Sequence, residues 1–147
     1  MKKALMISVL LVFACGCHSD IVTTKQFKLI KEKFVYIHPI DCEDPFVGRV
    51  LRDVLEKEFI RKKVRFSDAN TANVIITGST FLTVRSAGKT GWFGSKEASA
   101  QAIESVAITA KDRQGNVLLT ASYDNSEQLT ASKLAKEFGS TLAYKLR

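Results

Sequence analysis

The chain has 147 residues with a formal net charge of +7, a length that suits one compact domain with its own core. Lys2 and Lys3 stand at the start, so the rest of the chain carries a modest excess of +5. No apolar run approaches the roughly 20 residues that a membrane-spanning helix needs, which argues against an integral membrane protein.

The first residues have the pattern of a secretory signal. Lys2 and Lys3 precede an uncharged, mostly apolar stretch over residues 4–14, which leads into small residues. We therefore predict a signal peptide over residues 1–16, with cleavage before Cys15 or Cys17. An exported protein rarely meets nucleic acid, so no nucleic-acid partner is expected.

The two cysteines at the end of this signal are the candidates for lipidation. Bacterial lipoprotein signals place small residues before a cysteine that receives a diacylglyceryl group. Val12 favours acylation of Cys15, whereas Gly16 favours Cys17. Neither is followed by Asp, so the predicted location is the periplasmic face of an outer membrane.

Other chemistry at this cysteine pair is disfavoured. The spacing C-x-C-H is one residue short of a haem attachment motif, and a zinc site would need two further ligands. We expect no metal and no cofactor. If Cys15 is acylated, Cys17 could form a disulfide with Cys42, whereas acylation of Cys17 would leave Cys42 as a free thiol.

The rest of the chain is predicted to contain a tether over residues 17–32 and a single domain over residues 33–147. Aromatic and β-branched residues predict a strand at 34–37. Asp44 and Pro45 suit the N-cap and first position of a helix. The apolar stripe that follows predicts that this helix continues to the basic cluster at 61–63.

The second half of the domain has strand patterns and a final helix. A short strand at 64–66 precedes a strong strand at 74–85, in which Gly78 indicates a bulge or a close approach. Strands at 102–112 and 117–124 form a hairpin across an Arg-Gln-Gly-Asn turn.

An amphipathic C-terminal helix completes the predicted order β-α-β-β-β-β-α. We therefore predict an α+β two-layer sandwich. Its sheet is mixed and mostly antiparallel, with two helices on one face.

Two groups of residues are candidates for binding a partner or a lipid. Trp92 and Phe93 lie in a Gly-rich loop, where large aromatic side chains are costly to leave in water. The second group consists of cations at and after the end of the first long helix: Arg61, Lys62, Lys63 and Arg65.

Enzymatic chemistry is not expected. His38 and Cys42 lie four residues apart with a proline between them, whereas catalytic Cys/His pairs usually come from distant segments. The stretch at 87–90 ends like a P-loop but has Thr83 where the first glycine of the motif belongs.

The order of elements resembles the lipopolysaccharide-assembly lipoproteins, which plug the outer-membrane translocon barrel. The likeness rests on the "CGCH" start at 15–18, the "ANVIITG" strand and the "KDRQGNVLL" hairpin. The start implies that Cys15 is the acylated residue. Penicillin-binding-protein activators, curli-channel subunits and the Tol N-terminal domain have a similar pattern.

The sequence therefore predicts a non-enzymatic, lipid-anchored accessory subunit in envelope biogenesis. Its leading version acts in lipopolysaccharide transport and assembly, with an outer-membrane or periplasmic protein partner that could be a β-barrel, and with lipopolysaccharide itself as a candidate ligand. The alternative is an activator of a cell-wall synthase or a subunit of a secretion channel.

Overall fold

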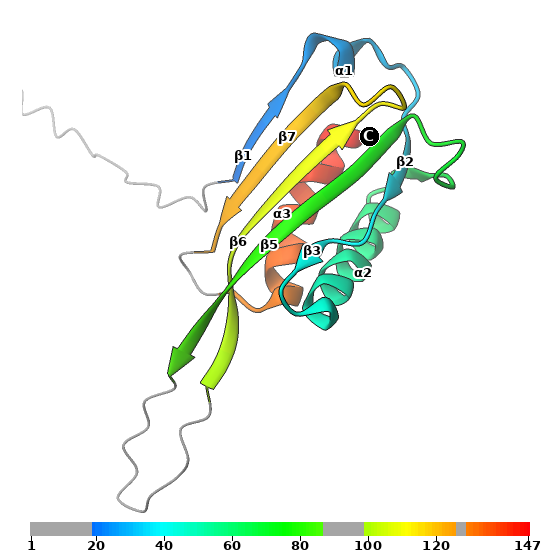
Figure 1. The fold of residues 1–147 in the computed structure, drawn as a ribbon. Helices are drawn as coiled ribbons and strands as arrows, with labels where there is room; N and C mark the ends of the chain where they lie inside the picture. The colour runs from blue at the N-terminus through cyan, green and yellow to red at the C-terminus, as the bar shows by residue number, and fades with distance from the viewer. Residues whose placement is uncertain (1–18, 87–98, 126–128) are drawn as a thin grey trace, which may run out of the picture.

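A computed structural model describes residues 19–86, 99–125 and 129–147, which form a two-layer α+β sandwich (Figure 1). This confirms the predicted fold class. The strands are β1 (Ser19–Thr23), β2 (Phe34–Ile37), β3 (Asp41–Cys42), β4 (Arg65–Phe66), β5 (Val74–Ser86), β6 (Ser99–Lys111) and β7 (Val117–Asp124). The helices are α1 (Lys25–Leu29), α2 (Pro45–Arg61) and α3 (Ala131–Leu146).

The strands form one mixed sheet in the order β1-β7-β6-β5-β2-β4, with β3 also paired to β5. The pairs β1–β7, β7–β6 and β6–β5 are antiparallel. The pairs β5–β2, β5–β3 and β2–β4 are parallel. Pairing therefore changes direction at β5, which joins an antiparallel half to a parallel half.

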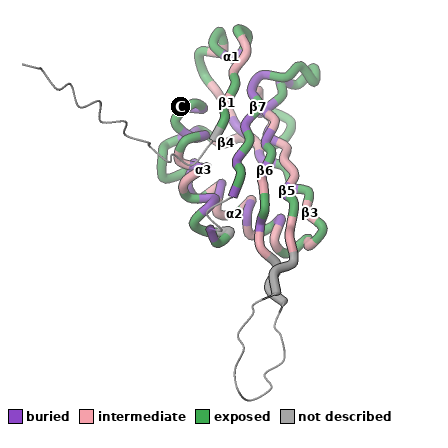
Figure 2. The backbone as a smooth tube through the Cα atoms, turned by 90° about the vertical axis from the view of Figure 1, so that its left-hand side faces the viewer, coloured by how far each residue is buried: buried purple, intermediate pink, exposed green. Residues whose placement is uncertain are grey.

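Helices α2 and α3 cover one face of this sheet and enclose the core (Figure 2). Their apolar stripes face the strands because residues three and four apart share one side of a helix. The largest fully buried side chains come from both layers: Ile37, Leu51, Leu55, Phe59, Ile76, Ile108, Leu118, Leu119, Leu134, Phe138, Leu142 and Leu146.

Two local predictions from the sequence are confirmed. The Asp44 side chain accepts a hydrogen bond from the backbone N–H of Phe46 at 2.8 Å, and α2 begins at Pro45. At Gly78 an added Cβ would lie 2.6 Å from Cδ1 of Ile108. The strand therefore needs glycine there for a close approach, and the irregularity in register occurs later, between Phe81 and Leu82.

The predicted tether over residues 17–32 is wrong for most of its described part. Residues 19–23 form β1, which pairs with β7 along its whole length, and residues 25–29 form α1. The Thr24 side chain accepts from the N–H of Phe27 at 3.2 Å and donates to the carbonyl of Leu118 at 3.1 Å. Phe27 is buried, so this segment belongs to the folded domain. The two-residue strand β3 was also not predicted.

Within the described ranges, no helix combines the length and apolar character needed to span a membrane.

Asp112, at the turn between β6 and β7, connects α1 to this end of the sheet by hydrogen bonds. Its carboxylate accepts hydrogen bonds from the Gln26 side chain at 2.9 Å and from the Asn116 side chain and N–H, both at 2.8 Å. The N–H of Gln114 donates a further bond at 2.9 Å. These donors, the Asn116 side chain foremost, hold the pKa of Asp112 below its ordinary value.

We predict that Asp112→Asn lowers the free energy of unfolding at neutral pH and makes that free energy less dependent on pH in the acid range. Because the folded-state pKa is lowered, the stabilisation is present above the unfolded value near 3.8 and is lost as pH falls through the folded value. Urea denaturation between pH 2 and about pH 7 would measure this. Asp124→Asn, which removes the same charge from an exposed side chain, is the control. An equal effect of both substitutions would contradict the prediction.

Candidate functional site

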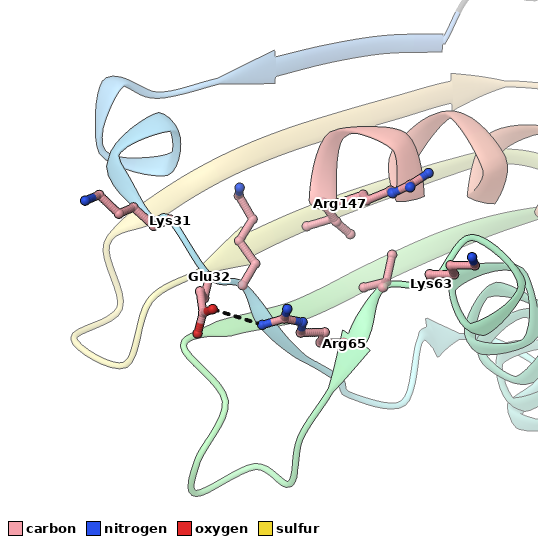
Figure 3. A pocket seen from close by; sticks show the side chains of 8 residues that line it. Lys31, Glu32, Lys63, Arg65 and Arg147 are labelled. Atoms are coloured by element: carbon pink, nitrogen blue, oxygen red, sulfur yellow. Dashed lines mark ion pairs between the residues drawn. The ribbon is translucent and has the colours of Figure 1, made fainter.

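The candidate site lies at one end of the sheet, where three segments distant in the sequence meet (Figure 3). β2 and β4 are parallel, with Phe34 opposite Arg65, so the residues that precede each strand lie at the same end of the sheet. These residues are the connection 31–33 and the turn 63–64. The C-terminal end of α3 completes the site.

The end of α2 fixes one side of this site. The N–H of Lys63 donates to the carbonyl of Ile60, and the N–H of Val64 donates to the carbonyl of Phe59, both at 2.9 Å. This pair of bonds is a Schellman motif, and the buried side chains of Phe59 and Val64 provide its apolar contact. Lys63 therefore adopts φ 63°, in the left-handed region where glycine is usual.

The three segments enclose a hollow of about 250 Å³, which we call the basic hollow. Its lining is rich in cations: Lys31, Glu32, Lys33, Lys63, Val64, Arg65, Leu146 and Arg147. Five of these eight side chains are cationic and one is anionic, so the hollow is a positively charged surface.

Two of the five cations are held by neighbouring groups. Arg65 Nη1 lies 3.2 Å from Glu32 Oε1, and its guanidinium carbon lies 5.9 Å from the centre of the Phe34 ring. Lys33 Nζ lies 4.9 Å from the centre of the Phe27 ring. Both side chains of the Glu32–Arg65 pair are exposed, and such pairs contribute only about 0–1 kcal/mol to the free energy of unfolding.

The remaining cations of the hollow have no carboxylate partner among the described residues. Within the part of the chain that the structure describes, Lys31, Lys63 and Arg147 form no ion pair. Their charge is available for an anionic group.

The structure separates the four predicted basic candidates. Lys63 and Arg65 line the basic hollow, whereas Arg61 and Lys62 do not. Arg61 Nη2 lies 2.7 Å from Oε2 of the buried Glu58, which also accepts a hydrogen bond from Ser140. Arg61 is therefore paired within α2, while Glu58 links α2 to α3 through Ser140. Lys62 is an exposed C-cap residue.

Several predicted residues cannot be placed. Cys15, Cys17, Trp92 and Phe93 lie outside the described residues, so lipidation and docking by the aromatic pair stay predictions.

Sequence reasoning missed three cations of the hollow. Lys31 and Lys33 fell in or beside the predicted tether, and Arg147 follows the last helix. The parallel pairing of β2 with β4 is the signal that could have placed Lys31 and Lys33 beside Lys63 and Arg65, whereas no local pattern indicates the position of Arg147.

The pair considered for catalysis has ordinary structural surroundings. The His38 ring packs edge-on against Tyr36 with centroids 5.1 Å apart. Cys42 is a half-buried free thiol. Among the described residues, no three His, Cys, Asp or Glu side chains gather as a metal site would require.

Comparison with solved structures supports the fold. A PelC dodecamer from Paraburkholderia phytofirmans aligns with a TM-score of 0.57 and 16% identity, over 88% of this chain and 98% of that one. A PDZ domain protein from Parabacteroides distasonis aligns at 0.53 and 13% identity, over 85% of this chain but only 34% of its own. At these identities the likeness concerns the fold alone.

A minor lipoprotein from Acinetobacter baumannii aligns over 71% of this chain and 91% of its own at 18% identity, with a TM-score of 0.35 that is too low to support an argument. No family model and no curated protein matches the chain. The resemblance to lipopolysaccharide-assembly lipoproteins therefore stays a prediction.

We predict that Lys63→Gly raises the free energy of unfolding by about 0.5–1 kcal/mol, because glycine adopts the left-handed conformation without the steric cost that a side chain carries. Lys63→Ala, which removes the charge but keeps Cβ, is the matched control and should leave stability nearly unchanged. Urea denaturation with an unchanged m value would measure both. Destabilisation by Lys63→Gly would show that the lysine side chain supports the fold.

Proposed function

We propose that this chain is a non-enzymatic lipoprotein that works by binding, as an accessory subunit in envelope biogenesis at the periplasmic face of the outer membrane. The observation that carries the proposal is the position of β1. The strand begins at Ser19, two residues after Cys17 and four after Cys15, so folded structure starts beside the predicted anchor.

The short connection limits how far the domain can lie from a membrane. An extended chain spans at most about 3.5 Å per residue. An acylated Cys15 or Cys17 would therefore hold the start of β1 within roughly 7–14 Å of its lipid. A domain held this close is suited to binding ligands or partners at the membrane surface.

In the leading version, the protein contributes to lipopolysaccharide transport or assembly. The cations of the basic hollow would contact lipid phosphates, and the domain would bind an outer-membrane or periplasmic protein, with a β-barrel as the favoured kind. The charge of the hollow and the sequence resemblance support this version.

The anchor is tested by substituting each candidate cysteine in the native host. We expect one of Cys15→Ser and Cys17→Ser to abolish palmitate incorporation and to release the protein from the outer-membrane fraction. Cys42→Ser is the control and should leave both unchanged. Retention of the label in Cys15→Ser and Cys17→Ser alike would contradict the anchor. Depletion that leaves lipopolysaccharide at the cell surface unchanged would contradict the leading version.

A second candidate function, a subunit of a secretion channel, is favoured by a different observation. The sheet face opposite α2 and α3 bears small side chains in register: Thr77, Thr109 and Thr120 form one row, and Ser79, Ala107 and Ser122 form the next. The acids Asp20 and Asp124 and the cation Lys111 are exposed on this face, whereas cations outnumber acids on the exposed sides of α2 and α3.

This difference in charge suits head-to-tail packing of one copy on the next, which closes into rings when the rotation permits. The PelC of similar fold is itself a dodecamer. A ring-forming subunit of a channel is therefore the alternative to the leading version.

We predict for this alternative that the detergent-solubilised lipoprotein is a ring oligomer and that Thr120→Arg converts it to a monomer, because a long cation would separate the packed faces. Native mass spectrometry would measure the mass. Asn70→Arg, in an exposed turn outside both faces, is the control. A monomeric wild-type protein at about 50 µM would exclude this alternative, since obligate assemblies persist at micromolar concentrations.

A further inference from the structure

We propose that the basic hollow is a binding site for a phosphoryl group. This inference deepens the leading version above and rests on it only for the source of the phosphate, which that version assigns to a lipid headgroup. The site itself rests on its lining residues, which include three cations that were not among the sequence candidates.

Cations from separate parts of the chain line the hollow. Lys31, Lys63 and Arg147 come from three segments that the fold brings to one hollow, and none of them has a carboxylate partner among the described residues. An anion bound in the hollow would be attracted by cations of more than one segment.

The cations of the hollow are distinct from those in the last turns of α2 and α3. α2 and α3 both end at the hollow, and the carbonyls at a helix C-terminus attract positive charge. Each helix already has a cation in its last turn, Arg61 in α2 and Lys145 in α3. Neither residue lines the hollow, so the cations of the hollow are additional to the last-turn cation of each helix.

Lys63 has an unusual backbone conformation for a lysine. The Schellman motif is satisfied by backbone bonds and by the contact of Phe59 with Val64, so it does not need the Lys63 side chain. Glycine would fit the φ of 63° without strain. A lysine held in this conformation on the wall of a cationic hollow points to a role for its ammonium group.

The size and donors of the hollow indicate the ligand class. A volume of about 250 Å³ lies below the roughly 300–1,000 Å³ of pockets that enclose a whole drug-sized molecule, so the hollow suits a small charged group. Lysine ammonium groups act as point charges toward phosphate, and an arginine guanidinium matches two of its oxygens. Glu32 forms an ion pair with Arg65 at 3.2 Å, and a phosphate would compete with Glu32 for the guanidinium.

The test is a titration of the full-length lipoprotein in detergent micelles with inorganic phosphate, at ionic strength kept constant with chloride and followed by calorimetry. We expect saturable binding. Lys63→Ala and Lys63→Gly should each weaken it roughly tenfold, as loss of a charge-assisted contact does. Lys62→Ala removes the same charge from the adjacent exposed residue and should change affinity less than about twofold.

Glu32→Gln provides a change of opposite sign. It releases Arg65 from its carboxylate and should tighten phosphate binding roughly threefold. Equal weakening by Lys62→Ala and Lys63→Ala, or the absence of saturable binding, would overturn the proposal. Either result would mean that phosphate is attracted by the overall positive charge and not bound at a specific site.

A second arm identifies the source of the phosphate. Micelles doped with phosphatidic acid are compared with micelles doped with phosphatidylcholine. Tighter, Lys63-dependent binding to phosphatidic acid than to inorganic phosphate supports a lipid ligand. Equal affinity for phosphatidic acid and inorganic phosphate supports the site but contradicts the lipid source. Failure of the proposed function is therefore distinguishable from failure of the site.

Discussion

The parallel pairing of β2 with β4 and β5 is the constraint on which the site depends. In the antiparallel half, the pairs β5–β6 and β6–β7 join strands that follow one another in the chain. The parallel half requires α2 to cross over between β2 and β4, and this crossover brings the C-terminal end of α2 back to the start of β2. Without that pairing, the connection 31–33 and the turn 63–64 would not meet.

The crossover must also stop abruptly, since β4 begins at Arg65, four residues after α2 ends at Arg61. The Schellman motif makes this stop possible by reversing the backbone at Lys63. The same bonds that terminate the helix therefore fix the direction of the Lys63 backbone. Packing of Phe59 and Val64 into the core makes the motif rigid, so a structural requirement of the fold positions a residue of the candidate site.

The elements that could be predicted from the sequence are those with strong periodic patterns. α2 has both a cap and an apolar stripe, and β5 to β7 have long apolar or alternating runs, so their positions were predicted within a few residues. β1 has none of these signals: Val22 is 57% exposed, and the strand exists because its backbone completes β7. Pairing of this kind is a tertiary effect that a local pattern does not contain.

The candidate site was predictable only in part for the same reason. The sequence predicted one basic cluster from four neighbouring residues, Arg61, Lys62, Lys63 and Arg65. Arg61 is paired with Glu58, however, and neither Arg61 nor Lys62 lines the hollow. Which members of a charge cluster act together depends on the direction in which each side chain leaves a turn. Lys31, Lys33 and Arg147 joined the site through topology rather than through sequence proximity.

The position of the hollow relative to the predicted anchor constrains how the domain would lie on a membrane. β1 runs for five residues from the anchor side toward α1, a length of about 17 Å at 3.4 Å per residue. The start of β2, beside which the hollow lies, is at the end of the sheet that β1 approaches (Figure 1). A domain standing upright on its anchor would hold the hollow away from the headgroups. Because β1 and β4 are opposite edges of the sheet, a domain resting on its β1 edge would also hold the hollow off the membrane. Contact with phosphates of the anchoring membrane therefore requires one face of the sandwich to lie along the surface, whereas an upright domain would present the hollow to ligands in the periplasm.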